Sequence, residues 1–355
     1  MNNQLSNQLI DGKLRIIYNQ QITSINILRF MQITELDVVN CGNIAPKLSS
    51  KTIIRLNIDS CSLRTLEYLN LPNLIALSLQ NNNIYNISCL SKMTALRQLN
   101  LSQNRIEDIS ALSSLRSLKE LDLSFNASTL NLSILQQLIQ LTKLNLSGNK
   151  LASIIYLRSL INLQELDVSF NRIKSISPIN KMKNISVLNC SNNQVHYISV
   201  LGTLVNLQTL NLSCNNIVNL VPLCNALKLQ VLDLSYNWIM HVESLQYLKN
   251  LTQLNLSYNY IIQFSSIMLN SNFQFFDIYQ NRLKCYIKYY QINYSIVEQT
   301  SSKLQQIENK REFLMNKLKQ TNKRTNKYLK MGYKQHILIS IELSAFSQSL
   351  NDGSQ

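Results

Sequence analysis

Five aromatic residues in three neighbouring copies of one motif are the clearest candidates for functional chemistry. The stretch LQVLDLSYNWI, residues 229–239, contains Tyr236 and Trp238, and Trp238 is the only tryptophan of the chain. The next two stretches of the same form add three tyrosines: Tyr258, Tyr260 and Tyr279. Exposed aromatic side chains in one place are typical of protein contacts. The alternative is that some of these rings fold over the turn and seal neighbouring copies against each other.

A second group combines acidic and aromatic side chains and lies earlier in the chain. Its members, beside Lys150 and Arg172, are Glu120, Asp122, Phe125, Glu165, Asp167 and Phe170. We expect both groups to contact another protein through the concave face of the fold that the repeats form.

Catalytic motifs are absent from the sequence. It contains no glycine-rich phosphate loop, no His-Glu-x-x-His motif and no paired Cys-x-x-Cys. The three histidines, His196, His241 and His336, are isolated from one another, and a solvated role is expected for them. The sequence therefore predicts a protein that is not an enzyme and has no cofactor, no metal site and no small-molecule substrate.

The elements that position the aromatic residues come from a repeat with the frame LxxLxLxxNxI. Its period is nearly constant at about 22 residues, which lies in the range of known repeat architectures. The copies start at Ile33, Ile53, Leu74, Leu96, Leu118, Leu141, Leu163, Ile185, Leu207, Leu229, Leu251 and Phe273. A degenerate copy starts at Asp11 and keeps Leu14, Ile16 and Asn19 in frame.

Each position of the frame has a physical role. Alternation predicts a short strand with positions four and six inward, such as Leu232 and Leu234, and positions three, five and seven outward. Position nine ends the strand with a side chain that can both donate and accept, as a buried turn requires. It is asparagine in ten copies: Asn82, Asn104, Asn126, Asn149, Asn171, Asn193, Asn215, Asn237, Asn259 and Asn281. Cys41 and Cys61 occupy it in the first two full copies.

After the turn, apolar residues recur at every third position, as in Ile106, Ile109, Leu112 and Leu115. This spacing predicts a short helical or 3₁₀ return segment. A unit of this size cannot bury its own apolar face, so the copies must stack. The predicted fold is an α/β solenoid, with a parallel sheet on its concave face and short helical or 3₁₀ segments on its convex face.

The frame resembles the leucine-rich-repeat family, in its class of short repeats. That class occurs in the regulatory subunit of protein phosphatase 1 and in bacterial internalins. The resemblance covers residues 11–295. It implies a protein-binding scaffold, and a regulatory or targeting subunit of a protein phosphatase, with the catalytic subunit as partner, is the nearest specific analogue. An internalin-like adhesin is a further alternative that requires secretion.

Charge separates the last part of the chain from the repeats. Residues 303–334 contain ten Lys or Arg and two Glu, which is +8 of the net +15. Their apolar spacing predicts an amphipathic helix whose basic side chains include Lys310, Arg311, Lys317, Lys319, Lys323, Arg324, Lys327 and Lys330. Two interpretations remain open: a solvated or docked helix, and a segment that binds nucleic acid, an anionic membrane surface or an acidic protein.

These features predict the division of the chain. Residues 1–32 are expected to form an N-terminal cap that includes the degenerate repeat, and residues 33–283 contain the twelve repeats. Residues 284–299 should form a C-terminal cap, and residues 300–355 the basic helical tail. No apolar run approaches a membrane span, no signal peptide is recognised, and the seven cysteines are scattered singly. The expected location is intracellular, in the cytoplasm or nucleus.

Overall fold

The computed structural model describes residues 9–17, 33–41, 48–126, 130–263 and 272–282. The chain divides into two compact units, Met1–Tyr286 and Ile287–Gln355, and all described residues belong to the first. The predicted C-terminal cap 284–299 and the basic tail 300–355 lie outside the described residues, and so does most of the predicted N-terminal cap.

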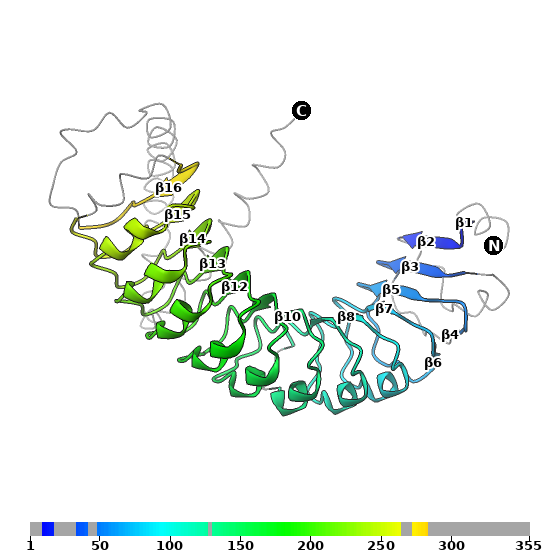
Figure 1. Ribbon diagram of the computed structural model, residues 1–355. Helices are drawn as coiled ribbons and strands as arrows, with labels where there is room; N and C mark the ends of the chain where they lie inside the picture. The colour runs from blue at the N-terminus through cyan, green and yellow to red at the C-terminus, as the bar shows by residue number, and fades with distance from the viewer. Residues whose placement is uncertain (1–8, 18–32, 42–47, 127–129, 264–271, 283–355) are drawn as a thin grey trace, which may run out of the picture. The chain divides into compact units, whose positions relative to one another are not determined.

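One sheet of fourteen strands runs through the described residues in chain order (Figure 1). Its strands are β1 (Leu9–Ile10), β2 (Lys13–Ile17), β3 (Glu35–Val39), β5 (Arg55–Asp59), β7 (Ala76–Ser78), β8 (Gln98–Asn100), β9 (Glu120–Asp122), β10 (Lys143–Asn145), β11 (Glu165–Asp167), β12 (Val187–Asn189), β13 (Thr209–Asn211), β14 (Val231–Asp233), β15 (Gln253–Asn255) and β16 (Phe275–Asp277). From β2 to β16 all neighbours are parallel, and only β1 pairs antiparallel, with β2.

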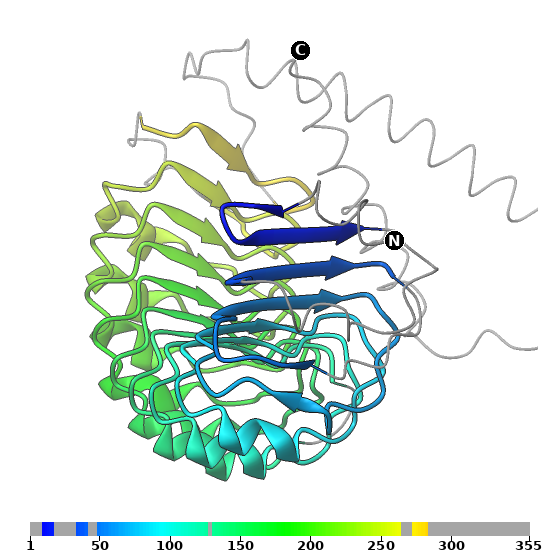
Figure 2. The same cartoon turned by 90° about the vertical axis from the view of Figure 1, so that its right-hand side faces the viewer.

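The strand register follows the repeat frame without slippage. Leu232 in β14 pairs with Leu210 in β13 and Leu254 in β15, which occupy the same position in the copies before and after it. Leu14 in β2 pairs with Leu36 in β3, so the degenerate copy enters the sheet in frame. Within this unit the strands line the inner side of an arc, as Figures 1 and 2 show. The predicted parallel solenoid is confirmed.

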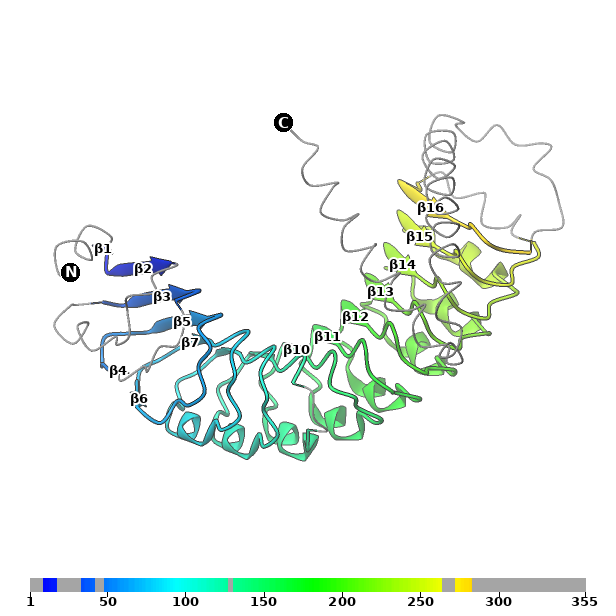
Figure 3. The same cartoon turned by 180° about the vertical axis from the view of Figure 1, so that it is seen from behind.

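The return segments on the outer side are 3₁₀ helices, as predicted (Figure 3). They are η2 (Ser88–Lys92), η3 (Ser110–Ser114), η4 (Leu132–Gln137), η5 (Ile155–Ser159), η6 (Ser177–Lys181), η7 (Ser199–Thr203), η8 (Val221–Asn225) and η9 (Glu243–Tyr247). The copies that start at Ile33 and Ile53 are shorter than those that follow. They use two-residue strands instead, β4 (Leu48–Ser49) and β6 (Leu69–Asn70), which pair with each other.

One continuous apolar core lies between the sheet and the return segments. In the copy that starts at Leu229, the inward residues Leu232, Leu234, Ile239 and Leu245 are all buried. The expected outward direction of position seven is wrong. Ser235 and the serines equivalent to it are buried, because the strand ends at position five and the chain has already begun to turn.

Candidate protein-binding surfaces

The concave face of the sheet forms an open hollow of about 1380 Å³. Its floor consists of side chains at positions three and five, from Lys13 in β2 to Asn211 in β13. Parallel sheets are usually covered by helices on both faces. The 3₁₀ helices of the described residues lie on the outer side of the sheet, and none of them covers its inner face.

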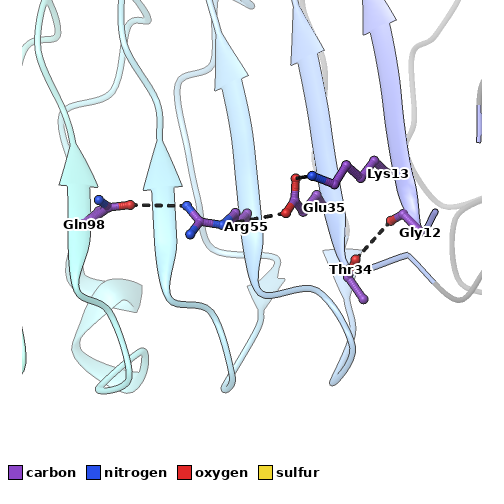
Figure 4. A network of polar contacts seen from close by, with 6 residues as sticks. All are labelled: Gly12, Lys13, Thr34, Glu35, Arg55 and Gln98. Atoms are coloured by element: carbon purple, nitrogen blue, oxygen red, sulfur yellow. Dashed lines mark hydrogen bonds and ion pairs between the residues drawn. The ribbon is translucent and has the colours of Figure 1, made fainter. Parts of the chain in front are cut away.

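The N-terminal part of the hollow is organised by ion pairs between neighbouring strands (Figure 4). Glu35 lies between two cations, with Lys13 Nζ at 3.1 Å and Arg55 Nε at 3.8 Å. Arg55 also donates to Gln98 Oε1 at 3.3 Å, past the small side chain of Ala76 on the strand between them. These contacts link side chains of β2, β3, β5 and β8 across the floor of the hollow.

The predicted acidic group lies in the centre of this hollow. Lys143 Nζ pairs with Glu165 Oε1 at 2.8 Å, and this hydrogen bond raises the pKa of Lys143. Asp122 and Asp167 have a structural role as well. One oxygen of each accepts from the serine backbone N–H two residues later, and the other accepts from the asparagine amide on the next strand. Of the four acids, Glu120 is therefore best placed to bind a partner, whereas Glu165 would have to exchange its ion pair with Lys143.

The hollow is acidic although the protein is basic. Four cationic and seven anionic side chains line it, a net charge of −3, whereas the whole chain carries +15. A low-dielectric concave surface focuses such a field. The hollow therefore favours positively charged groups.

The asparagines at position nine form a ladder behind the sheet. Asn215 is typical: Nδ2 donates to the carbonyls of Cys190 at 2.9 Å, Leu212 at 3.1 Å and Ser213 at 3.1 Å. Its Oδ1 accepts from the Val195 backbone N–H at 2.9 Å. Each amide thus satisfies turn groups of its own copy and of the preceding copy. At Cys61 the thiol donates to Asp59 O and Val38 O and accepts from the Cys41 N–H at longer distances of 3.2 to 3.5 Å.

Position eight, directly before each asparagine, adopts a left-handed backbone conformation. Phe125, Phe170, Tyr236 and Tyr258 all have φ between 53° and 55°. The rings of Tyr236 and Tyr258 stack at 4.2 Å between centroids, and Tyr258 meets Tyr279 edge-on at 5.8 Å. The structure thus brings these three tyrosines together as contacts between copies, which is the second of the two interpretations of the aromatic group.

Phe125 and Phe170 flank Gly148, which occupies position eight of the copy between them. The two ring centroids are 6.5 Å apart, and Phe125 packs directly over the glycine. A Cβ atom on Gly148 would come within 2.5 Å of Phe125 Cδ1. Both rings are about half exposed, so they also remain open to a partner at the rim of the sheet.

Trp238 and Tyr260 occupy a different place from the stacked tyrosines. They stand at position ten, after the turn, and neither lines the hollow. Their backbone N–H groups donate to Ile217 O and Ile239 O, both at 2.9 Å. These backbone hydrogen bonds join neighbouring copies on the far side of the turn from the sheet. Trp238 is 56% exposed, and the Arg282 guanidinium carbon lies 4.4 Å from the centre of the Tyr260 ring.

A second asparagine ladder was not predicted. The residue directly before the first position of a copy is often asparagine, and its amide donates to a turn carbonyl of the preceding copy. The bonds are Asn73 to Lys51 O, Asn162 to Ile139 O, Asn206 to Lys183 O, Asn250 to Leu227 O and Asn272 to Lys249 O, from 2.7 to 3.3 Å. Asparagine before the leading leucine is the sequence signal that could have identified it.

Titratable and metal-binding groups offer no second kind of site in the described part of the chain. No cluster of three or more His, Cys, Asp or Glu suits a metal ion there. His196 and His241 are exposed. Burial raises the pKa of the Cys89 and Cys214 thiols to about 11, so both are poor nucleophiles. Within the same residues, no helix has the length and apolarity needed to cross a membrane.

Comparison with family models finds repeats of one kind along the sheet. Two models match, described as "Leucine Rich repeats (2 copies)" at residues 72–114, 94–136, 139–181 and 161–201 and as "Leucine rich repeat" at residues 205–261. No curated protein sequence matches the chain.

Solved structures with a similar fold come from bacteria and a plant. An internalin of Listeria monocytogenes, InlF, is 27% identical to this chain, and the TM-score is 0.67. The match covers 71% of this chain and 75% of the internalin chain. A leucine-rich-repeat protein of Leptospira interrogans is 24% identical with a TM-score of 0.62, over 80% and 88%. The ectodomain of an Arabidopsis thaliana receptor kinase, solved with CASPARIAN STRIP INTEGRITY FACTOR 2, is 21% identical with a TM-score of 0.62. That match covers 76% of this chain and 35% of the ectodomain, and the last two similarities concern the fold alone.

Proposed function

Since the chain belongs to the leucine-rich-repeat family, we propose that it is a non-catalytic scaffold whose concave face binds another protein. The observation that carries this proposal is the open hollow of about 1380 Å³ along one face of the parallel sheet. Solenoids commonly use their extended concave surfaces for binding.

The charge of the hollow defines what a partner segment should offer. With a net charge of −3 among its lining side chains, the hollow favours a partner with lysines or arginines near Glu120 and Glu165. Phe125 and Phe170 add apolar contact area at the rim. A protein phosphatase catalytic subunit is the specific partner that the resemblance of the repeat suggests.

A matched pair of substitutions tests the concave face. Val187 in β12 lines the hollow and is 37% exposed, whereas Val221 in η8 is 63% exposed on the outer side. Val187→Trp places a bulky side chain in the floor of the hollow beside Glu165, and Val221→Trp adds the same bulk elsewhere. We expect the full chain to capture the same proteins from its own cells as wild type and as Val221→Trp, and to lose them as Val187→Trp. Equal capture by all three, measured by quantitative mass spectrometry, would contradict the proposal.

The same captured proteins address the narrower suggestion. A phosphatase catalytic subunit among the proteins lost by Val187→Trp supports a regulatory subunit, and its absence leaves only the general scaffold. An intracellular location is part of this proposal, because the six cysteines within the described residues are free thiols. Fractionation of the producing cells tests it.

The basic segment 303–334 carries the second candidate function. Its charge of +8 suits nucleic acid or an anionic surface. Deletion of residues 300–355 should abolish binding to such a ligand, together with its steep salt dependence, and should leave the binding of a concave-face protein partner unchanged.

A further inference from the structure

We infer that the edge of the solenoid next to the turns is a second binding surface, which takes an extended acidic and apolar segment of a protein. This edge surface consists of side chains at positions ten and twelve of several copies. Its basic part is Lys150, Arg172 and Lys174, and its apolar part is Val218, Trp238, Met240 and Tyr260. It is separate from the concave hollow, because none of these residues lines that hollow.

The backbone after each turn explains why these side chains share one face. Position nine is a buried asparagine and position eleven a buried aliphatic residue, as at Asn237 and Ile239. In an extended segment alternate side chains point the same way, so positions ten and twelve both face outward. Lys150 departs from this geometry, because its φ is +56°, and its place on the edge rests on its exposure. The N–H groups of Arg172, Trp238 and Tyr260 each bond to a carbonyl of the preceding copy at 2.8 to 2.9 Å. This ladder fixes the spacing of the side chains before a partner binds.

The apolar part is too large to be scattered surface residues. Val218, Trp238, Met240 and Tyr260 are 40%, 56%, 41% and 38% exposed, and they lie on three consecutive copies. Contiguous exposed patches of large apolar side chains mark interaction sites. Tryptophan, tyrosine and arginine are also the residues that most often dominate binding energy.

Charge decides what kind of segment fits. From Lys150 to Ile262, positions ten and twelve contain three cations and no Asp or Glu. A further cation, Arg282, follows at position ten of the next copy, and its guanidinium carbon lies 4.4 Å from the centre of the Tyr260 ring. Within the described residues, no ion pair joins Arg172 or Lys174 to an acid. An occupant with carboxylates at one end and bulky apolar side chains at the other therefore matches both parts. Single-stranded nucleic acid would match the cations, but it would leave Val218 and Met240 covered by polar groups.

The geometry also predicts the spacing within the occupant. Arg172 and Trp238 are three copies apart, and strands of a sheet lie about 4.8 Å apart, so the two side chains are separated by about 14 Å. An extended chain advances about 3.3 Å per residue. The acidic and apolar contacts should therefore be about four residues apart in the partner.

The test uses the full chain and fluorescein-labelled peptides of twelve residues. Each peptide carries three Glu, then a Ser/Thr spacer of three residues and two Phe, so that the last Glu and the first Phe are four residues apart. It is made in both orders. Control peptides have no spacer or replace the three Glu by Ser. Fluorescence anisotropy gives the dissociation constant, and Trp238 emission shows independently whether the peptide lies on this surface.

We expect one order of the spaced peptide to bind better than the controls by at least about fivefold and to change the Trp238 emission. Arg172→Gln with Lys174→Gln should weaken it about fivefold to tenfold, as two exposed charge pairs allow, and Tyr260→Ala about tenfold. Arg116→Gln with Lys119→Gln removes the same charge from exposed residues elsewhere and should change affinity less than twofold.

Three results would overturn the inference. The first is equal weakening by both charge-removing variants, which would mean that net charge or the basic segment binds the peptide. The second is equal affinity for spaced and control peptides, or no binding at millimolar concentration. The third concerns competition by single-stranded RNA. If the RNA displaces the peptide from the wild type at a lower concentration than unlabelled peptide does, and fails to do so from Arg172→Gln with Lys174→Gln, the surface binds nucleic acid.

Discussion

Two adjacent asparagines allow the contribution of the position-nine ladder to be measured. Asn215 is 4% exposed and makes the four hydrogen bonds described above. Asn216, the next residue, stands at position ten with a partly exposed side chain, and its backbone N–H bonds to Val195 O. Replacement of either residue by alanine removes the same atoms, but only Asn215→Ala leaves buried carbonyls and an N–H without partners.

The expected loss follows from these bonds. A satisfied hydrogen bond contributes about 0.5–1.5 kcal/mol, and a buried polar group left unsatisfied costs about 1–3 kcal/mol. We therefore expect Asn215→Ala to lower the free energy of unfolding by about 3 kcal/mol, and Asn216→Ala by less than about 0.5 kcal/mol. Asn215→Cys should lie between the two, because the thiols of Cys41 and Cys61 make the equivalent bonds at greater length.

Urea unfolding provides the assay. Trp238 is the only tryptophan and belongs to the copy that follows Asn215, so its emission reports on this part of the solenoid, while circular dichroism reports on the whole. With a typical slope of about 1–3 kcal/mol per molar urea, the midpoint of Asn215→Ala should fall by about 1 M or more. Equal midpoints for the two alanine variants would refute the role assigned to the ladder.

Three further predictions concern other positions of the repeat. Gly148→Ala should cost about 2 kcal/mol, because its Cβ meets Phe125 Cδ1 at 2.5 Å and its φ is +69°; urea unfolding measures the loss, and Phe125→Ala should recover part of it in the double variant. Burial raises the pKa of Asp233, so the folded state holds this proton more tightly than the unfolded state, and stability falls as pH rises from about 4 through the raised pKa. Asp233→Asn should therefore raise the urea midpoint at pH 7 and lose this advantage below pH 4; no difference at pH 7 would contradict the reasoning. Because burial raises the pKa of Cys89 and Cys214 to about 11, a thiol reagent at pH 8 should label both more than tenfold more slowly in the folded than in the unfolded protein, which mass spectrometry can follow.

The fold was predictable because its main determinants lie within a single copy. Leu232 and Leu234 mark the strand, Asn237 marks the turn, and Leu245 marks the return segment. Because the spacing of the copies is constant, only one strand register keeps equivalent positions paired across the sheet. Even the short copies at the start follow from this logic. Each has less chain for its return than a full copy has, and the two use the extended β4 and β6 there.

The direction of side chains near the turn could not be predicted in the same way. Period-two alternation holds only inside a strand, and from β7 onward the strands end at position five, so Ser235 at position seven turns inward. A left-handed backbone at Phe125 or Tyr236 is equally invisible in the sequence, because such residues rarely adopt it. The stacking of Tyr236 on Tyr258 depends on that conformation, which is why the sequence left two interpretations of the aromatic group open.

The sequence also did not reveal where one copy supplies a hydrogen bond that the next copy lacks. Asp or Asn at position five accepts from the backbone N–H two residues later, as Asp122 does, but the copy that starts at Leu74 has Ser78 there, which does not make this bond. Asp59, at position seven of the preceding copy, supplies it instead: Oδ1 accepts from the Gln80 N–H and from Ser78 Oγ, both at 2.7 Å. Burial raises the pKa of Asp59 despite these bonds. A repeat frame read one copy at a time does not reveal such exchanges.

The roles of the frame positions indicate where information about a partner can reside. Positions four, six, nine and eleven build the core, and positions five, seven and eight serve the turn and the neighbouring copy, which leaves positions three, ten and twelve free to vary. At position three the side chains include charges up to Glu165 in β11 and are uncharged from Val187 in β12 onward. At positions ten and twelve the last cation before the apolar part is Lys174, in the same copy as Glu165. Position three thus becomes uncharged after the copy that starts at Leu163. Positions ten and twelve contain no Lys, Arg, Asp or Glu from Gln194 to Ile262, and cations return at Arg282 and Lys284. Because the frame itself does not change at that boundary, a partner that spans it meets charged side chains on one side and uncharged side chains on the other.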